Sequence, residues 1–207
     1  MTDDFRAGLE RAMSARPARR VDPQGARRAA VLIPVVALPE PSLIFTVRTH
    51  TLPSHRGEIS FPGGSIDDSD ASPKEAALRE ANEEVGLDPG LVEVVGEIDN
   101  LHTFVSGYVI SPFVGWIAEP PKLLPNPAEV ATVLEVPIAG LTDAIRSESG
   151  FARGGRTYPT EAWVWGEDVI WGITGRILRL FLERLAEAGL IEAPAPPRDP
   201  WPEPARP

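Results

Sequence analysis

The sequence predicts an α/β protein in which a mixed sheet lies between helices. Three observations support this fold class: several apolar runs of strand length, a capped polar helix over 73–85, and a longer amphipathic helix over 170–188. Each helix has an apolar stripe to bury, so we expect the first on one face of the sheet and the second on the other. Composition alone indicates only that α and β structure are mixed.

The expected strands are apolar runs bounded by turn residues. They are 29–38, 43–48, 92–98, 108–117, 133–136 and 162–165. The first two flank the sequence Pro-Glu-Pro-Ser at 39–42, which is typical of a turn. We therefore expect these two strands to pair with each other.

The helix over 73–85 has start and stop signals of its own. Ser72 is a favourable N-cap, Pro73 occupies the first helical position, and Glu75 completes an S-x-x-E capping box. Gly86 stands where a left-handed residue would close the C-terminus. The helix is expected to run from Pro73 to Val85.

Apolar residues at helical spacing predict the second helix, which we expect to end at Gly189. Its stripe comprises Ile173, Ile177, Leu178, Phe181, Leu182 and Leu185. A proline-rich tail follows and is expected to be extended.

We expect three parts: a short helix and basic connector in 1–28, one domain over 29–190, and the tail over 191–207. The helix is expected at 3–15. The connector, 16–28, contains five arginines and is interpreted as a solvated linker, with a phosphate-binding arm as the alternative.

Composition excludes several classes of function. The chain has 207 residues and no cysteine, which excludes disulfides and thiol catalysis and favours a cytoplasmic protein. A net charge of −10 argues against general nucleic-acid binding. No apolar run approaches the ~18–20 residues of a membrane span, and the first residues lack a secretory pattern. The sequence leaves the oligomeric state open, a homodimer included.

Three carboxylates and an arginine lie on the helix over 73–85. Glu80, Glu83 and Glu84 stand at i, i+3 and i+4 and share one helix face. Their mutual repulsion predicts a bound hard cation, Mg²⁺ or Mn²⁺, because carboxylate oxygens are its preferred ligands. Arg79 is placed to hold a carboxylate by a two-pronged hydrogen bond. The alternative interpretation is the solvated face of a charged helix.

A glycine pair precedes this helix. The run Phe61-Pro62-Gly63-Gly64 indicates the end of a strand turning into a loop. Glycines at such a place let the backbone approach a ligand closely, so Gly63 and Gly64 are candidate substrate-binding positions.

The segment 63–87 resembles the Nudix box, in which a glycine, five residues, an acid and seven residues precede R-E-U-x-E-E-x-G-U, with U aliphatic. The second half matches at Arg79, Glu80, Glu83, Glu84, Gly86 and Leu87, with a small residue, Ala81, at the first U. In the first half, an aspartate, Asp70, takes the place of the glutamate, and eight residues precede Arg79. The extra residue leaves open whether Asp67, Asp68, Asp70 or none of them reaches the metal.

A second pattern lies upstream of the box. It comprises Thr46, Arg48, Leu52, His55, Gly57 and the run 61–64. This pattern is similar to one that is typical of the coenzyme A pyrophosphatase branch of Nudix hydrolases, although Glu58 replaces the expected glutamine. Segments 101–112, 126–137 and 171–174 are also similar to that branch, so the resemblance covers roughly residues 30–188.

The resemblance implies a Nudix-type α/β/α sandwich and a metal-dependent pyrophosphohydrolase. It implies that coenzyme A, or a derivative, is cut to 4′-phosphopantetheine and adenosine 3′,5′-bisphosphate. Glu80 and Glu84 are the metal ligands we expect first, with Glu83 as a third, and the general base is expected to be Glu83 or Glu129.

A CoA-like nucleotide is then the expected partner. Arg48, His55 and Arg56 are candidates to contact its phosphates. For Arg48 and His55, a purely structural role is the alternative. The alternative substrates are ADP-ribose, nucleotide sugars and dinucleoside polyphosphates, and a non-catalytic nucleotide sensor is a further alternative.

Overall fold

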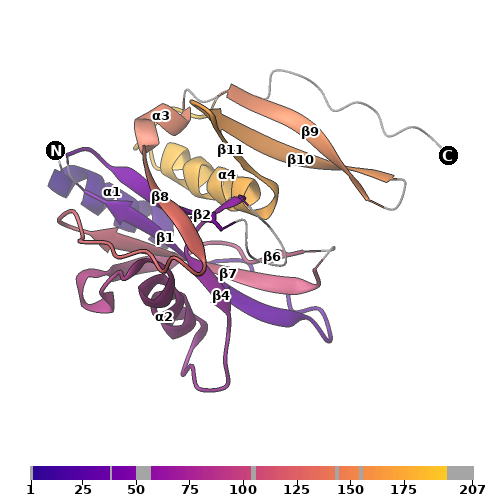
Figure 1. The fold of residues 1–207 in the computed structure, drawn as a ribbon. Coiled ribbons are helices and arrows are strands. Elements are labelled where there is room, and N and C mark those ends of the chain that lie inside the picture. The colour runs from indigo at the N-terminus through magenta and orange to yellow at the C-terminus, as the bar shows by residue number, and fades with distance from the viewer. Residues whose placement is uncertain are drawn as a thin grey trace.

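The computed structural model describes residues 2–37, 39–49, 57–103, 106–142, 145–153 and 156–194 (Figure 1). Its helices are α1 (Thr2–Ser14), α2 (Pro73–Val85), the short 3₁₀ helix η1 (Pro89–Leu91), α3 (Ile138–Thr142) and α4 (Gly172–Glu187). Its strands are β1 (Arg27–Val36), β2 (Ser42–Arg48), β3 (Ile59–Ser60), β4 (Gly63–Ser65), β5 (Glu93–Glu97), β6 (Leu101–His102), β7 (Tyr108–Ile117), β8 (Val130–Pro137), β9 (Ile145–Arg153), β10 (Arg156–Trp165) and β11 (Asp168–Trp171). Among these helices, none is both long and apolar enough to cross a lipid bilayer.

The described strands form a larger sheet of eight strands and a smaller sheet of three. The larger one has the order β3-β2-β1-β7-β5, with β4 on β1, β6 on β7 and β8 on β2. β1 and β7 are parallel over ten residue pairs, while the other pairings in this sheet are antiparallel. The predicted mixed sheet is therefore confirmed. The smaller sheet has the order β11-β10-β9, and its hairpin extends away from the rest of the molecule (Figure 1).

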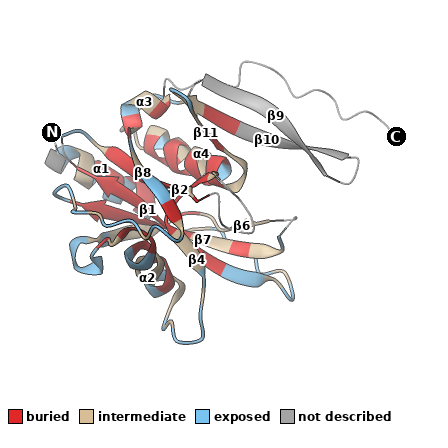
Figure 2. Cartoon of the chain, in the orientation of Figure 1, coloured by how far each residue is buried: buried red, intermediate tan, exposed pale blue. Residues whose placement is uncertain are grey.

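The central strand β1 buries both of its faces. Alternate side chains of a strand point to opposite faces. Leu32 and Val36 accordingly lie in the apolar cluster beneath α2, while Ile33 and Val35 lie in the cluster beneath α1 and α4. Figure 2 shows this central part of the sheet as buried, and Figure 1 shows α2 on one side of it and α4 on the other. Because both faces are covered, the strand is a continuous apolar run rather than an alternating one.

Helix α2 has the predicted bounds and caps. The Ser72 side chain accepts a hydrogen bond from the amide of Glu75 at 3.2 Å, and Gly86 adopts the left-handed conformation with φ of 67°. The helix buries three alanines completely against the sheet, Ala76, Ala77 and Ala81. The small residue at position 81 thus belongs to an alanine face that lets the helix axis lie close to the strands.

Several elements differ from the sequence prediction. The predicted strand over 162–165 is the end of the longer β10, and the predicted helix over 170–188 begins at Gly172 because β11 occupies the preceding residues. Strands β3, β4, β6, β9 and β11 and helix α3 carry no strong periodic signal, because they are short or polar.

The basic connector is mostly exposed, in line with a solvated linker, and several of its residues contact the segment 97–100. Arg16 and Arg184 both contact Asp99, at 2.7 and 3.0 Å. Arg20 pairs with Glu97, and the amide and carbonyl of Val21 both bond the side chain of Asn100. These contacts fasten the connector to the loop after β5. Arg16 and Arg20 are already paired with carboxylates, which argues against the phosphate-binding arm.

Candidate active site

A buried and a half-buried carboxylate of α2, Glu84 and Glu80, lie against the glycine strand β4. Glu84, only 3% exposed, accepts a hydrogen bond from the amide of Gly63 at 3.2 Å. The Glu80 carboxylate lies so close to Gly64 that a Cβ there would come within 2.5 Å of it. At Gly63 the backbone has a φ of +154°, and a Cβ would meet the carbonyl oxygen of Ala30 at 2.4 Å. Gly63 therefore lets β4 pair closely with β1, and Gly64 leaves room for the Glu80 carboxylate in its present position.

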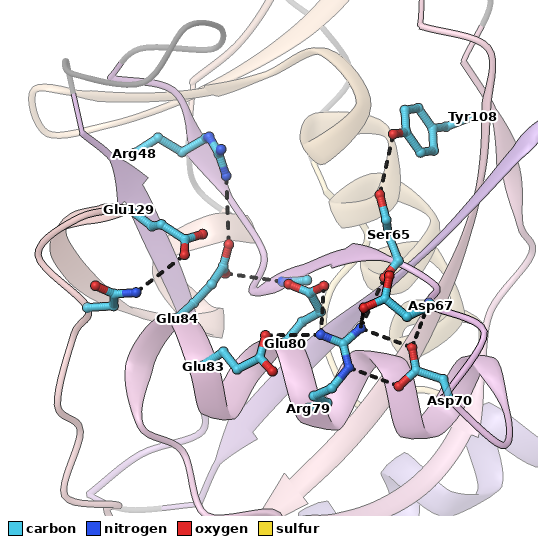
Figure 3. A network of polar contacts seen from close by, with 12 residues as sticks. Arg48, Ser65, Asp67, Asp70, Arg79, Glu80, Glu83, Glu84, Tyr108 and Glu129 are labelled. Atoms are coloured by element: carbon cyan, nitrogen blue, oxygen red, sulfur yellow. Dashed lines mark hydrogen bonds and ion pairs between the residues drawn. The ribbon is translucent and has the colours of Figure 1, made fainter.

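Arg79 is the hub of a network of polar contacts (Figure 3). Its Nε and Nη2 atoms donate to the two carboxylate oxygens of Asp70 at 2.9 and 3.0 Å. Its Nη1 atom donates to Glu80 at 3.1 Å and to Glu83 at 3.0 Å. A hydrogen bond from Arg79 lowers the pKa of Asp70, so this carboxylate stays ionised. The two-pronged partner of the arginine is Asp70, and Arg79 in turn orients Glu80.

This arrangement distinguishes the acids that the sequence leaves equivalent. Asp70 is bound to Arg79, while Asp67 is exposed and lies 3.8 Å from the same guanidinium. Asp68 is exposed on the loop. Glu83 is also largely exposed, in contrast to Glu84, and its carboxylate turns to Arg79. On α2, Glu80 and Glu84 are thus the two carboxylates that could hold a metal ion without first leaving an exposed position.

Arg48 and Glu129 complete the carboxylate cluster from two other segments. Arg48 ends β2, where the register with β8 shifts between Val47 and Arg48. Such a bulge re-aims a side chain, and here Arg48 Nη1 lies 3.7 Å from Glu84 Oε1. Glu129 precedes β8, accepts a hydrogen bond from Asn126 at 3.3 Å, and lies beside Arg48 and Glu84 in Figure 3.

The electrostatics of this cluster favour binding of a cation. Burial raises the pKa of Glu84 to about 7, and the charges of Glu80 and Glu129 add to the rise, against the Gly63 amide and Arg48. Burial likewise raises the pKa of Glu80. These shifts show that the local cations do not fully compensate the carboxylates. A divalent cation would supply the missing positive charge.

The donor set fits Mg²⁺ or Mn²⁺. Across the part of the chain that the structure describes, no three acidic or histidine side chains already enclose one point. Mg²⁺ keeps several waters and is commonly bound through one or two carboxylates. Glu80 and Glu84 provide that number from one rigid helix, one turn apart.

A cavity of about 310 Å³ lies next to these carboxylates. Its lining combines Arg48, Gly63 and Gly64 with residues that the sequence analysis did not predict to bind substrate. These are, among others, Ser65, Tyr108, Ile110, Ile173, Thr174 and Ile177. Their position in the sequence does not show that they meet, because β4, β7 and α4 come together at the cavity only in the folded chain. His55 and Arg56 lie outside the described residues.

Comparison with known proteins shows the family. A model of the NUDIX domain matches residues 26–144. The uncharacterized Nudix hydrolase NudL of Escherichia coli K12 is 39% identical over 180 residues, which cover 86% of this chain and 91% of that protein. NudL of Photorhabdus laumondii is 37% identical over 163 residues, covering 77% and 85%. The chain therefore belongs to the Nudix family.

Solved structures of Nudix domains align with part of the chain. The Mycobacterium smegmatis Nudix hydrolase RenU is 23% identical, with a TM-score of 0.45, over 57% of this chain and 74% of that one. The NUDIX domain of Shewanella oneidensis NrtR, solved with ADP ribose, is 18% identical, with a TM-score of 0.46. The match covers 58% of this chain and 80% of that one.

Membership of the family confirms the predicted fold class and the enzyme class. The protein is a Nudix hydrolase with a mixed sheet between helices. Its substrate is a nucleoside diphosphate derivative, and Nudix hydrolases generally need divalent metal ions.

Proposed function

We propose that this enzyme hydrolyses the pyrophosphate bond of coenzyme A or a derivative, giving 4′-phosphopantetheine and adenosine 3′,5′-bisphosphate, with Mg²⁺ or Mn²⁺. One observation carries the proposal. Residues of the upstream pattern, Arg48 and Phe61, line the same cavity as Gly63 and Gly64 of the box. The residues that resemble the coenzyme A branch therefore lie beside the hydrolytic site.

Each residue of the cluster has a role in this proposal. A cation held by Glu80 and Glu84 would neutralise the pyrophosphate and lower the pKa of a bound water. Arg79 fixes the position of Glu80 through the bond at 3.1 Å. Glu129 is the proposed general base, because its charge acts on Glu80 and Glu84, whereas Glu83 is exposed and bound to Arg79.

Arg48 is the proposed contact to a substrate phosphate. Its guanidinium lies 3.7 Å from Glu84, so a phosphate next to a cation on Glu84 would lie within its reach. Within the described part of the chain, its buried Nε atom has no hydrogen-bond partner. A guanidinium with a spare donor is suited to bind phosphate oxygens.

The test of catalysis is a hydrolysis assay on coenzyme A, with products identified by mass spectrometry. We expect a chelator to abolish turnover and Mg²⁺ or Mn²⁺ to restore it. Glu84→Gln should lower kcat at least about 100-fold, which equals roughly 2.7 kcal/mol. The matched control is Glu183→Gln, which removes a charge from an ion pair on α4 and should leave kcat unchanged. Normal turnover by Glu84→Gln would refute the site assignment.

The test of specificity compares coenzyme A, dephospho-coenzyme A and ADP-ribose. The cations near 48–64 are the candidates to bind the 3′-phosphate, which only coenzyme A carries. Arg48→Ala or Arg56→Ala should lower kcat/KM for coenzyme A more than for dephospho-coenzyme A, by about 10-fold or more. Equal losses on both would indicate that the arginine contacts the pyrophosphate, which the two substrates share, or that it is structural.

The alternatives give different results in the same assays. Faster cleavage of ADP-ribose, a nucleotide sugar or a dinucleoside polyphosphate would assign another substrate to the same hydrolytic site. Binding of nucleotide without turnover would indicate a sensor. A homodimer and a cytoplasmic location stay predictions, and sedimentation of the purified protein tests the first.

A further inference from the structure

Tyr108 lies at the first position of β7 and is fixed from one side by an arginine. It is the parallel-strand partner of Arg27, the first residue of β1. The guanidinium carbon of Arg27 lies 4.1 Å from the centre of the Tyr108 ring. Arg27 Nη2 also donates a hydrogen bond to the carbonyl of Ser106 at 2.7 Å. The cation is therefore held over one face of the ring.

The hydroxyl and the backbone of Tyr108 are fixed as well. The hydroxyl lies 3.3 Å from Ser65 Oγ, and the carbonyl of Ser65 accepts a hydrogen bond from Arg79 at 3.1 Å (Figure 3). The Tyr108 amide donates to Thr103 Oγ1 at 2.8 Å. The ring is thus connected through a single residue to the network that orients Glu80. A ring held in this way loses little conformational entropy when a ligand binds.

Tyr108 belongs to the lining of the cavity, and Arg27 covers one face of its ring. Arg27 itself is not among the described lining residues of the cavity. Helix α4 contributes two apolar residues to the same lining, Ile173 and Ile177. In Figure 3, Tyr108 and Arg48 lie on opposite sides of Glu80. A nucleotide whose phosphates contact Arg48 and the carboxylates would therefore extend its uncharged part to the ring.

We propose that Tyr108, backed by Arg27, is the surface on which the base of the substrate stacks. The ligand class is a purine nucleotide, because a flat, electron-rich ring gains from an aromatic face. A cation behind the tyrosine draws electron density from its ring and strengthens this contact. The inference rests on the proposed function only in requiring a nucleotide. It is the same for coenzyme A, ADP-ribose or another adenine-containing substrate.

The experiment uses AMP and ribose 5-phosphate, which differ only by the base. Calorimetry on the full chain should show that Tyr108→Leu weakens AMP binding about tenfold and leaves ribose 5-phosphate unchanged. Tyr108→Phe keeps the aromatic face and should bind AMP within about twofold of wild type. Equal weakening of both ligands, or no weakening by Tyr108→Leu, would overturn the proposal.

A second measurement does not depend on the folding of a variant. The chain has two tyrosines, so ring-labelled wild-type protein gives two sets of signals, and Tyr108→Phe assigns them. AMP should shift the Tyr108 signal upfield and show a nuclear Overhauser contact from adenine to that ring, whereas ribose 5-phosphate should do neither. If adding AMP leaves the Tyr108 signal unshifted, the proposed stacking is contradicted, whether or not calorimetry shows that AMP binds. Hydrolysis of coenzyme A is measured separately, so failure of the proposed substrate is distinguishable.

Discussion

Removing the charge of Glu84 should stabilise the protein in a chelating buffer while abolishing its activity. Burial raises the pKa of this carboxyl from 4.5 to about 7, so the folded state binds its proton more tightly than the unfolded state. At 1.36 kcal/mol per pKa unit, the rise corresponds to about 3 kcal/mol. Because the carboxyl pKa is raised on folding, this contribution to the free energy of unfolding is present below pH 4.5 and is lost as the pH rises through 7. Glu84→Gln should therefore be more stable than wild type by up to about 3 kcal/mol at pH 8.

The assay is urea unfolding at pH 5 and pH 8 with a chelator, followed by the same measurement with Mg²⁺ or Mn²⁺. The advantage of Glu84→Gln should appear at pH 8 and shrink at pH 5. Added metal should stabilise wild type more than the variant, because a ligand that binds only the folded state stabilises it in proportion to affinity. Glu83→Gln on the same helix is the control, since its side chain is exposed and should change stability by less than about 0.5 kcal/mol. A Glu84→Gln protein less stable than wild type at pH 8 would refute the reasoning.

Three further predictions concern contacts around the site and the connector. Burial raises the pKa of Asp99, but hydrogen bonds from Arg16 and its neighbours lower it more, and the net result is a pKa of about 2. In urea unfolding at pH 7, the free energy of unfolding of wild type should therefore exceed that of Asp99→Asn by about 2 kcal/mol. This difference should be lost as the pH falls through 2. Asp70→Asn removes a charge from the pair that fixes Arg79 and should lower kcat about 10- to 100-fold without changing the circular dichroism spectrum. Gly64→Ala brings a Cβ within 2.5 Å of the Glu80 carboxylate and should lower kcat on the order of 100-fold in the same hydrolysis assay, and unaltered kcat would show that Glu80 can move freely.

The strongly patterned elements of this fold follow from the sequence. The cap residues fix both ends of α2, and β7 has the predicted bounds because its apolar run is continuous. The hairpin of β9 and β10 could not be predicted from the sequence, since 145–153 is polar and its pairing is set by the partner strand. The contacts of the connector with Asp99 join residues more than eighty positions apart, and no local pattern encodes them.

The site shows the same division between local and distant information. The spacing of Arg79, Glu80 and Glu84 along one helix is visible in the sequence, and so is the pair of glycines that faces it. The burial of each acid is not visible in the sequence, because Glu83 and Glu84 are neighbours in the chain and yet Glu83 is exposed and Glu84 is buried. Tyr108 lies in a segment that resembles the coenzyme A branch, but its place at the cavity follows from strand pairing and is seen only in the fold.

The packing of α1 on α4 has a consequence for synthesis of the chain. Leu9 and Met13 are buried in one cluster with Phe181, and Arg184 donates to the carbonyl of Arg16 across 168 residues. During translation at about 5–20 residues per second, α1 would leave the ribosome roughly 10–30 s before α4. Its apolar face stays without this partner for that interval, when chaperone binding or aggregation competes with folding. We expect the nascent chain to acquire protease resistance around α1 only after the last helix has emerged.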